Sequence, residues 1–477
     1  MCGVVGVFGV TDSLSVMDKM TIALDHRGQQ GAGVVLAGRD GRCVYERSAS
    51  HYPRIDLALR MESQNIDGRN FFAGISHLRY GTSGSRRSVD NTQPLYRRTS
   101  WGEIYVAHNG DTPYYEEMKR DLLGRGMLFL TDSDTEIVLQ HIGLSKLTDS
   151  VEAIKHGLRA YRGTYAITML IKDNIDNEFK LIAARDPSGN RPLALGKLDG
   201  GHIIASESSA FETVGGEFLR EIQPNELLIV SDKKLSVHYI NPMTVVDERA
   251  QKLWHCVFEN VYFSHPSSTI FGIPVDLFRE ELGRRAARRF GHLVKDGDIL
   301  TNPPDSSNFF ADGFCKELDR HLEKVFIKRH GASVRSFTQE SDETRDLAIR
   351  IKFSILRRLV EGKRVWIKDD SVVRGRTARR LVRSLRNNGA VWVGVIAGFP
   401  PLVGPCHKGI DMDDLIASRH LVDGQPDIEQ VRKEIEADFL GYLAFEDLTD
   451  TISSLGQSPD NFCFGCLQNK EPIWKKW

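Results

Sequence analysis

The sequence predicts two domains of different class, an α+β first half and an α/β second half. The chain has 477 residues, which is longer than a single hydrophobic core ordinarily supports, so two domains of roughly 200 residues each are expected. Up to about residue 240, short strands are broken by turn residues, with few helical stretches. From about residue 275, helical stretches alternate with buried strands, and that order implies a parallel sheet.

The first half is built mainly from short runs rich in Val, Ile, Tyr and Phe. Strands are predicted over Val4–Phe8, Phe72–Ser76, Glu103–Ala107, Tyr165–Ile171, Phe179–Ala184, His202–Ala205 and Glu226–Val230. Amphipathic segments predict helices over Ser13–Leu24, Asp134–Leu144 and Val151–Ala160. Sheets covered by helices are therefore the expected arrangement.

The second half has a different order of predicted elements. Helical segments Asp276–Arg289 and Ala378–Leu385 alternate with buried strands Val365–Lys368 and Val391–Ala397. The polar, Pro-containing stretch Asn241–Glu248 is the expected joint between the halves.

Charge and composition exclude several classes of protein. Lys and Arg number 63 against 64 Asp and Glu, so binding of nucleic acid by bulk electrostatics is not expected. No apolar run approaches the roughly 20 residues of a membrane span, and the N-terminus lacks a signal peptide's pattern. The seven cysteines are expected to be thiols or metal ligands rather than disulfides. A cytoplasmic enzyme is therefore predicted.

Cys2 is a candidate nucleophile. If Met1 is removed, Cys2 carries a thiol and a free α-amine, and an amine with a pKa of about 7.7–8.0 can take the thiol proton. An early cysteine before glycine is more often a small buried side chain, so this position decides nothing by itself. Four polar motifs follow it in order: His77–Thr82, Asn91–Pro94, Ala107–Asp111 and Thr131–Glu136.

This ordered set resembles the class II glutamine amidotransferases, whose N-terminal-nucleophile fold stacks two antiparallel sheets between helices (αββα). The resemblance implies that Cys2 attacks the glutamine amide, with Asn109 and the Gly110 amide forming the oxyanion hole. It also implies that Arg79 binds the α-carboxylate of glutamine and Asp134 its α-amine. The alternative without a functional role is that Arg79 and Asp134 are only charged residues on the surface.

The stretch Val365–Thr377 runs from an apolar strand through a small-residue loop into a helix. Backbone amides of such a loop, at the positive end of the helix, suit a phosphate. A strand-ending Asp-Asp is otherwise often only a turn. The stretch resembles the phosphoribosyl-pyrophosphate motif of type I phosphoribosyltransferases, which implies an α/β domain. The residues implied to bind phosphoribosyl pyrophosphate and Mg²⁺ are Asp305, Ser306, Ser307, Arg335, Lys352, Asp369, Asp370, Ser371, Arg374, Gly375 and Thr377.

Together the two halves resemble the glutamine phosphoribosylpyrophosphate amidotransferases over nearly the full length. The resemblance implies a glutaminase domain over 2–240, a phosphoribosyltransferase domain over 241–445 and a tail over 446–477. The implied reaction transfers ammonia from glutamine to phosphoribosyl pyrophosphate, the first step of de novo purine synthesis. It further implies a homotetramer with purine-nucleotide effectors.

Four cysteines form a further candidate site. Cys463 and Cys466 make a C-x-x-C, which alone could be redox-active, half a zinc site or nothing. Cys256 and Cys406 stand where one branch of this family carries the other ligands of a [4Fe–4S] cluster. Four thiolates also suit Zn²⁺, so the iron–sulfur prediction depends on the resemblance. Cys43 and Cys315 match no motif, and the other cofactor implied is Mg²⁺.

The second site departs from the family pattern in four places. Arg376 replaces a threonine, where a guanidinium could bond the 5′-phosphate or fill its cradle, and Lys368 replaces an apolar residue. The segment Lys328–Phe337 lacks the usual aromatic residue, and Asn302–Pro304 is an unusual lead into the pyrophosphate loop. Two alternatives follow: a paralogue delivering ammonia to another phosphorylated acceptor, or a non-catalytic iron–sulfur scaffold. The complete glutaminase set argues against the scaffold.

Overall fold

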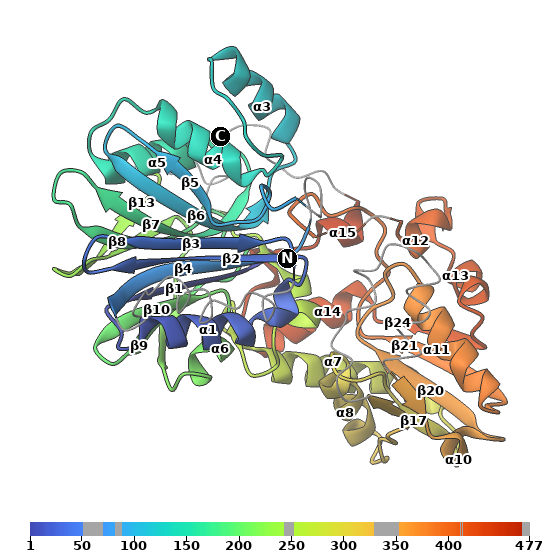
Figure 1. Ribbon diagram of the computed structural model, residues 1–477. Coiled ribbons are helices and arrows are strands. Elements are labelled where there is room, and N and C mark those ends of the chain that lie inside the picture. Colours follow the sequence, from blue (N-terminus) through green and yellow to red (C-terminus); the bar gives the residue numbers. More distant parts are fainter. Residues whose placement is uncertain are drawn as a thin grey trace.

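Two stacked antiparallel sheets form the first half (Figure 1). The computed structural model describes residues 1–50, 70–81, 88–242, 252–328, 353–410, 412 and 414–469. The seven-stranded sheet has the order β11 (Glu217–Glu221), β9 (Ala194–Leu198), β10 (Gly201–Ala205), β1 (Gly3–Phe8), β4 (Phe71–Arg79), β2 (Gly31–Gly38), β3 (Cys43–Ser48). The six-stranded sheet has the order β13 (Leu235–Tyr239), β12 (Glu226–Val230), β8 (Phe179–Arg185), β7 (Thr164–Asp173), β6 (Gly102–Asp111), β5 (Leu95–Arg98).

Helices cover the outer faces of both sheets. Helix α1 (Ser13–Ala23) and the short α6 (Ser209–Glu212) lie on the first sheet, while α4 (Thr135–Leu144) and α5 (Ser150–Ala160) lie on the second, with α3 (Tyr115–Gly124) beside α4. Strand β1 shows how the layers form: Val5 and Val7 pack toward α1, whereas Val4 and Phe8 pack toward the second sheet. Alternate side chains of a strand point to opposite faces, so a strand covered on both faces is apolar throughout. The αββα prediction is confirmed.

The second half is built on a parallel sheet with the order β17 (Ile299–Thr301), β20 (Arg364–Asp369), β21 (Trp392–Ala397), β24 (Phe439–Tyr442). Apolar residues of α7 (Val275–Phe290), α8 (Asn308–Glu317) and α14 (Phe445–Ser454) share one core with Trp366. Those of α11 (Arg376–Asn387) and α13 (Ile428–Glu434) share another with Val365 and Ile367. The carboxyl ends of parallel strands meet at one edge, so the loops after β17 and β20 adjoin there.

The sequence-based elements are confirmed to within a few residues. The strand predicted over Glu226–Val230 is β12 itself, and the helix predicted over Asp276–Arg289 is α7, one residue longer at each end. Most of the expected joint Asn241–Glu248 lies outside the described residues, as does the segment 329–337. Among the described helices, none is both long and apolar enough to cross a membrane.

Short elements connect these layers. They are the strands β14 (His255–Cys256), β15 (Thr269–Ile270), β16 (Ile273–Pro274), β18 (Phe326–Lys328), β19 (Phe353–Ile355), β22 (Leu421–Val422), β23 (Gln425–Pro426) and β25 (Phe462–Cys463), and the helices α10 (Arg357–Val360), α12 (Ile416–Arg419) and α15 (Gly465–Gln468). Single helical turns lie at Asp25–Arg27, Glu259–Phe263, Gly291–Leu293 and Pro459–Asn461.

The halves meet through main-chain hydrogen bonds and buried charges. The Trp254 amide donates to the Ser188 carbonyl at 2.9 Å, and the Cys256 amide donates to the Asn190 carbonyl at 3.2 Å. Strand β14 pairs in parallel with β25, which sets Cys256 beside Cys463. Alongside, the fully buried Arg27 pairs with Glu259 at 2.9 Å and with Glu207. The junction is therefore an ordered interface with its charges paired.

Candidate functional site

The Cys2 thiol lies where strands from both sheets of the first half converge. The Tyr80 amide, just beyond β4, donates to Cys2 Sγ at 3.4 Å. The Cys2 amide donates to Asn109 Oδ1 on β6 at 3.2 Å, and Arg27 Nε donates to the Cys2 carbonyl at 3.0 Å. Burial raises the pKa of the Cys2 thiol, and the Tyr80 amide and Arg79 only partly offset it. Such a thiol needs a base to become a nucleophile.

Charges of opposite sign flank the thiol. Arg79 ends β4 and Asp134 precedes α4, and both side chains are buried. Arg79 lowers the pKa of the Cys2 thiol whereas Asp134 raises it, so both act on Sγ. Tyr161 donates its hydroxyl hydrogen bond to Asp134 Oδ2 at 3.3 Å. One cation and one anion beside a thiol match the charges of an α-amino acid.

Asn109 keeps an unused donor. Its Nδ2 is buried and has no hydrogen-bond partner within the described chain, although buried polar atoms are almost always paired. The next residue, Gly110, has no room for a side chain, because a Cβ there would lie 1.9 Å from the Thr164 carbonyl oxygen. The β6–β7 ladder thus fixes two consecutive residues next to Cys2, one with a donor left over.

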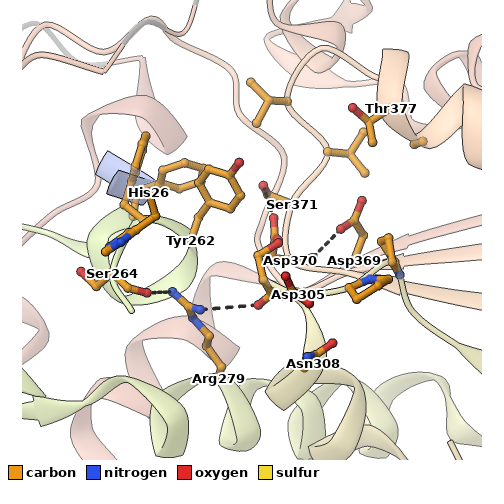
Figure 2. Close-up of a pocket in the computed structure, with 18 of the residues that line it drawn as sticks. His26, Tyr262, Ser264, Arg279, Asp305, Asn308, Asp369, Asp370, Ser371 and Thr377 are labelled. Carbon is orange, nitrogen blue, oxygen red and sulfur yellow. Dashed lines mark hydrogen bonds between the residues drawn. The ribbon is translucent and has the colours of Figure 1, made fainter. Parts of the chain in front are cut away.

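A cavity of about 730 Å³ borders the loops at the sheet edge of the second half (Figure 2). Asp369 is the last residue of β20 and Asp370 follows it. Both are buried, and the Ser371 hydroxyl donates to Asp370 Oδ1 at 2.9 Å. Gly375 precedes α11 with φ 74°, a left-handed conformation that favours glycine. The cavity lining contains the predicted residues Asp305, Ser306, Asp369, Asp370, Ser371, Arg374, Gly375 and Thr377.

One predicted residue of this site lies away from the cavity, and two lie outside the described residues. Ser307 does not line the cavity: its hydroxyl is fully buried and donates to the Pro303 carbonyl at 2.6 Å, which fixes the loop before α8. Arg335 and Lys352 lie outside the described residues. Lys328 and Phe353, in the paired strands β18 and β19, do line the cavity.

The cavity also reaches the first half. His26 and Tyr80 line it together with Tyr262 of the second half, as Figure 2 shows for His26 and Tyr262. Tyr80 is the residue whose amide contacts the Cys2 thiol. One chamber therefore extends from the neighbour of Cys2 to the acid pair Asp369–Asp370.

The four predicted metal-ligand cysteines line a second cavity, of about 660 Å³. Cys256 and Cys463 are register partners in β14 and β25, and the amides of Val403 and Gly404 donate to the Cys466 carbonyl. Cys406 follows in the same loop. Burial raises the pKa of Cys256 to about 12. Among described residues, no three Cys, His, Asp or Glu side chains converge closely enough for one metal ion.

Comparison with known proteins identifies the family. The family model of the glutamine amidotransferase domain matches residues 82–213. Amidophosphoribosyltransferase of Methanocaldococcus jannaschii is 34% identical over 99% of this chain and 98% of its own length. That of Bacillus subtilis is 34% identical over 99% of this chain and 94% of its own. The chain belongs to the amidophosphoribosyltransferase family.

Solved structures agree with this family assignment. Glutamine phosphoribosylpyrophosphate amidotransferase from B. subtilis, complexed with ADP and GMP, matches with a TM-score of 0.84 and 33% identity, covering 99% of this chain and 97% of that one. A structure described as the allosteric regulatory enzyme of purine biosynthesis matches with a TM-score of 0.85 and 33% identity, covering 99% and 96%.

Arg376, a departure from the pattern of the amidophosphoribosyltransferase family, is the first residue of α11 and lies inside the stretch predicted to bind phosphoribosyl pyrophosphate. Its guanidinium lines the cavity and pairs with Asp414 at 3.2 Å. Both side chains are about two-fifths exposed, at 41% each. Asp414 also pairs with Arg419, the last residue of α12, at 3.3 Å. The pairing turns part of the Arg376 charge toward Asp414.

Sequence reasoning missed several residues of this amidophosphoribosyltransferase-family site. Arg27 contacts the Cys2 carbonyl, and Arg279 of α7 donates to the carbonyl of Ser264 at 2.7 Å while lining the chamber. For Arg27 the sequence held one signal, an arginine directly before a glycine. In the structure Gly28 packs so closely against the Arg79 main chain that a Cβ would not fit. No sequence signal marked Arg279, because it looks like one more cation on a helix rich in arginine.

Proposed function

We propose that this protein makes phosphoribosylamine from glutamine, water and phosphoribosyl pyrophosphate, releasing glutamate and pyrophosphate. This is the first step of purine biosynthesis. The observation that carries the proposal is the single chamber that joins the neighbour of Cys2 to Asp369 and Asp370. An enzyme that frees ammonia at one end and consumes it at the other needs such a passage, because ammonia in bulk water at neutral pH mostly protonates.

The glutaminase half supplies a nucleophile, a base and donors for an oxyanion. Once Met1 is removed, the α-amine of Cys2 takes the thiol proton, and Sγ attacks the amide carbonyl carbon of glutamine. Asn109 Nδ2 and the Gly110 amide donate to the developing oxyanion. Ammonia leaves, and water then hydrolyses the thioester to glutamate. Arg79 and Asp134 hold the α-carboxylate and α-amine of the substrate.

The second half positions the acceptor. The amides of the loop Ser371–Thr377 and the start of α11 receive the 5′-phosphate, and Asp369 and Asp370 bind the ribose hydroxyls. Ammonia attacks the anomeric carbon as pyrophosphate departs. The carboxylates bordering the chamber are the oxygen ligands that Mg²⁺ prefers, and Mg²⁺ when bound neutralises charge on the pyrophosphate. Asp305 and Ser306 face that end of the chamber.

The deciding experiment measures phosphoribosylamine and pyrophosphate formed from either glutamine or ammonia, together with glutamine hydrolysis with and without phosphoribosyl pyrophosphate. Both nitrogen sources are expected to give product, and phosphoribosyl pyrophosphate is expected to stimulate glutamine hydrolysis. Hydrolysis indifferent to that substrate, without pyrophosphate release, would favour delivery of ammonia to another phosphorylated acceptor. If glutamine is not hydrolysed at all, only the alternative of a non-catalytic iron–sulfur scaffold would remain.

We further propose that Cys256, Cys406, Cys463 and Cys466 hold one [4Fe–4S] cluster. Tetrahedral zinc needs four sulfurs about 3.8 Å apart, at Zn–S distances near 2.3 Å. Here the thiols surround a cavity of about 660 Å³ instead of converging on a point. A cluster receives the thiolates at separate corners, which suits four thiols that line one cavity without converging on a point, and the choice of iron over zinc rests on the family resemblance. The cluster's role would be structural, tying the C-terminal segment to the second domain.

Iron analysis tests this assignment. Protein purified without oxygen is expected to be brown, with about four irons per chain and four cysteine ligands. Serine at any one of the four positions should lower the iron content and the thermal midpoint, because a ligand cross-link is weakened. Cys43→Ser is the matched control and should change neither. One zinc per chain in colourless protein would exclude the cluster while keeping the site.

Replacement of Arg376 tests the phosphate loop. Arg376→Thr is expected to weaken binding of phosphoribosyl pyrophosphate about tenfold, roughly 1.4 kcal/mol, because a cation bordering the phosphate site is lost. Calorimetry with Mg²⁺ measures it. Arg379→Thr serves as control, since Arg379 pairs with Glu436 and does not line the chamber. Tighter binding by Arg376→Thr would mean that the arginine obstructs the cradle.

Family membership also supports proposals on regulation and assembly. The B. subtilis relative was solved with ADP and GMP, so we include purine nucleotides as effectors of this protein. A homotetramer acting in the cytoplasm, with glutamine and phosphoribosyl pyrophosphate as substrates, completes the proposal. Sedimentation with and without a purine nucleotide measures both assembly and binding.

A further inference from the structure

Arg191 lies at the junction of the two halves and is fully buried. Its guanidinium donates to the Lys408 carbonyl and lies 3.7 Å from Glu259. Its Nε hydrogen is buried with no partner within the described chain. Glu259 pairs with this buried cation, and none of the catalytic steps above uses it.

Main-chain contacts bring Arg191 close to two of the four cysteines. The carbonyl of the preceding residue, Asn190, accepts from the Cys256 amide at 3.2 Å. The Lys408 carbonyl, to which the Arg191 guanidinium donates, is two residues beyond Cys406. The guanidinium therefore lies near the main chain that carries Cys256 and Cys406.

The same cation touches the loop that joins the cysteines to the glutaminase half. Lys408, whose carbonyl Arg191 holds, is two residues beyond Cys406, and that carbonyl also accepts from the Thr164 hydroxyl at 3.4 Å. At Gly409, with φ 94°, a Cβ would lie 3.0 Å from the Gly110 carbonyl oxygen and 2.9 Å from Asp111 Cβ. The cysteine loop therefore packs directly on the end of β6 that carries Asn109 and Gly110.

We propose that Arg191 is a positioning residue that balances the negative charge of the four-cysteine site and, through the Lys408 carbonyl, holds the end of β6 in place for glutamine hydrolysis. The inference rests on the proposed glutaminase and cluster. A cluster with four thiolates carries net negative charge, and a buried guanidinium near the main chain of two of its ligands stabilises it, most of all when reduced. Displacing Gly409 would remove packing from the end of β6 at Gly110, whose amide acts only in the transition state.

Two substitutions separate charge from geometry in the holoenzyme. Arg191→Gln removes the charge: the cluster's reduction potential should become more negative, and kcat with glutamine should fall at least tenfold with KM little changed. Arg191→Lys keeps the charge but loses the planar set of donors of the guanidinium. The cluster's reduction potential should stay near the wild-type value, while kcat with glutamine still falls. Product formation from ammonia should stay within about twofold in both, because the second site is intact.

Arg185→Gln is the matched control. Arg185 is equally buried in the same segment, but it donates to the carbonyls of Ile222 and Gly189 and does not contact Lys408. It should lower stability without a selective loss of glutamine turnover. An unshifted potential in Arg191→Gln, or equal loss with glutamine and ammonia in both Arg191 variants, would overturn the inference. Wild-type protein without iron, or without phosphoribosylamine synthesis, would instead show that the proposed function had failed first.

Discussion

The Cys2→Ala variant is expected to lose glutamine-dependent phosphoribosylamine synthesis by about a thousandfold or more, while synthesis from added ammonia continues at a rate close to wild type. The reason is spatial: the thiol contacts Tyr80 in the first half, whereas the acceptor loops belong to the second. Removing the proposed nucleophile leaves the chamber and its far end unchanged. Parallel assays with glutamine and with ammonium chloride at pH 8 measure the split.

Cys43→Ala provides the comparison, because Cys43 is a thiol of the same domain on β3 that lines neither cavity. It should retain both activities. Protein that retains Met1 should behave like Cys2→Ala, since the proposed base would be acylated. Loss of both activities in Cys2→Ala, at unchanged stability, would contradict two separate sites.

Lys368→Met is expected to stabilise the protein by on the order of 3 kcal/mol near pH 6. Lys368 is fully buried in β20, with Nζ 3.4 Å from the Trp366 carbonyl and 4.7 Å from the centre of the Phe314 ring. Burial lowers the pKa of Lys368 to about 7, although Cys315 and Asp298 raise it in part. Methionine fills similar space without a charge to desolvate.

The pH dependence gives this prediction a sign. The pKa of Lys368 is about 7 when folded and about 10.4 in an unfolded chain, so between these values the unfolded state binds more protons. The contribution of Lys368 to the free energy of unfolding therefore rises from pH 7 to pH 10. Below pH 7 the protein bears the full cost of burying the protonated Lys368 ammonium. Urea unfolding at pH 6 and pH 9 should show the advantage of Lys368→Met shrinking at the higher pH. The exposed Lys363→Met is the control, and a pH-independent difference would refute the assignment.

Strand and helix patterns carried most of the fold prediction because burial dictates them. Strand β1, apolar at every position, and the amphipathic α7 are readable from periodicity alone. Patterns were less informative at the junction, where β14 and β25 are two residues each and form only because distant segments meet. Such short pairs have no period to read.

The candidate sites divide in the same way. Cys2, Asn109 and Asp369 lie in local motifs, so their neighbourhood could be predicted from order along the chain. Arg191 could not, since its partners Glu259 and Lys408 are far along the chain and lie beside it only after the halves dock. Ser307 was named from the loop's resemblance, but sequence could not indicate that its hydroxyl turns inward to Pro303.

The parallel pairing of β14 with β25 has a consequence for synthesis on the ribosome. Cys256 emerges about 200 residues before Cys463, and N-terminal domains ordinarily fold first as translation proceeds. The glutaminase half can thus fold early, but β14, which bonds to it through the Cys256 amide, lacks its partner strand β25 until Cys463 has been made. A chain halted before Phe462 lacks a strand and two of the four thiols. Synthesis of β25 therefore completes the pairing of β14, and chains terminated before it expose an unpaired strand edge to proteolysis.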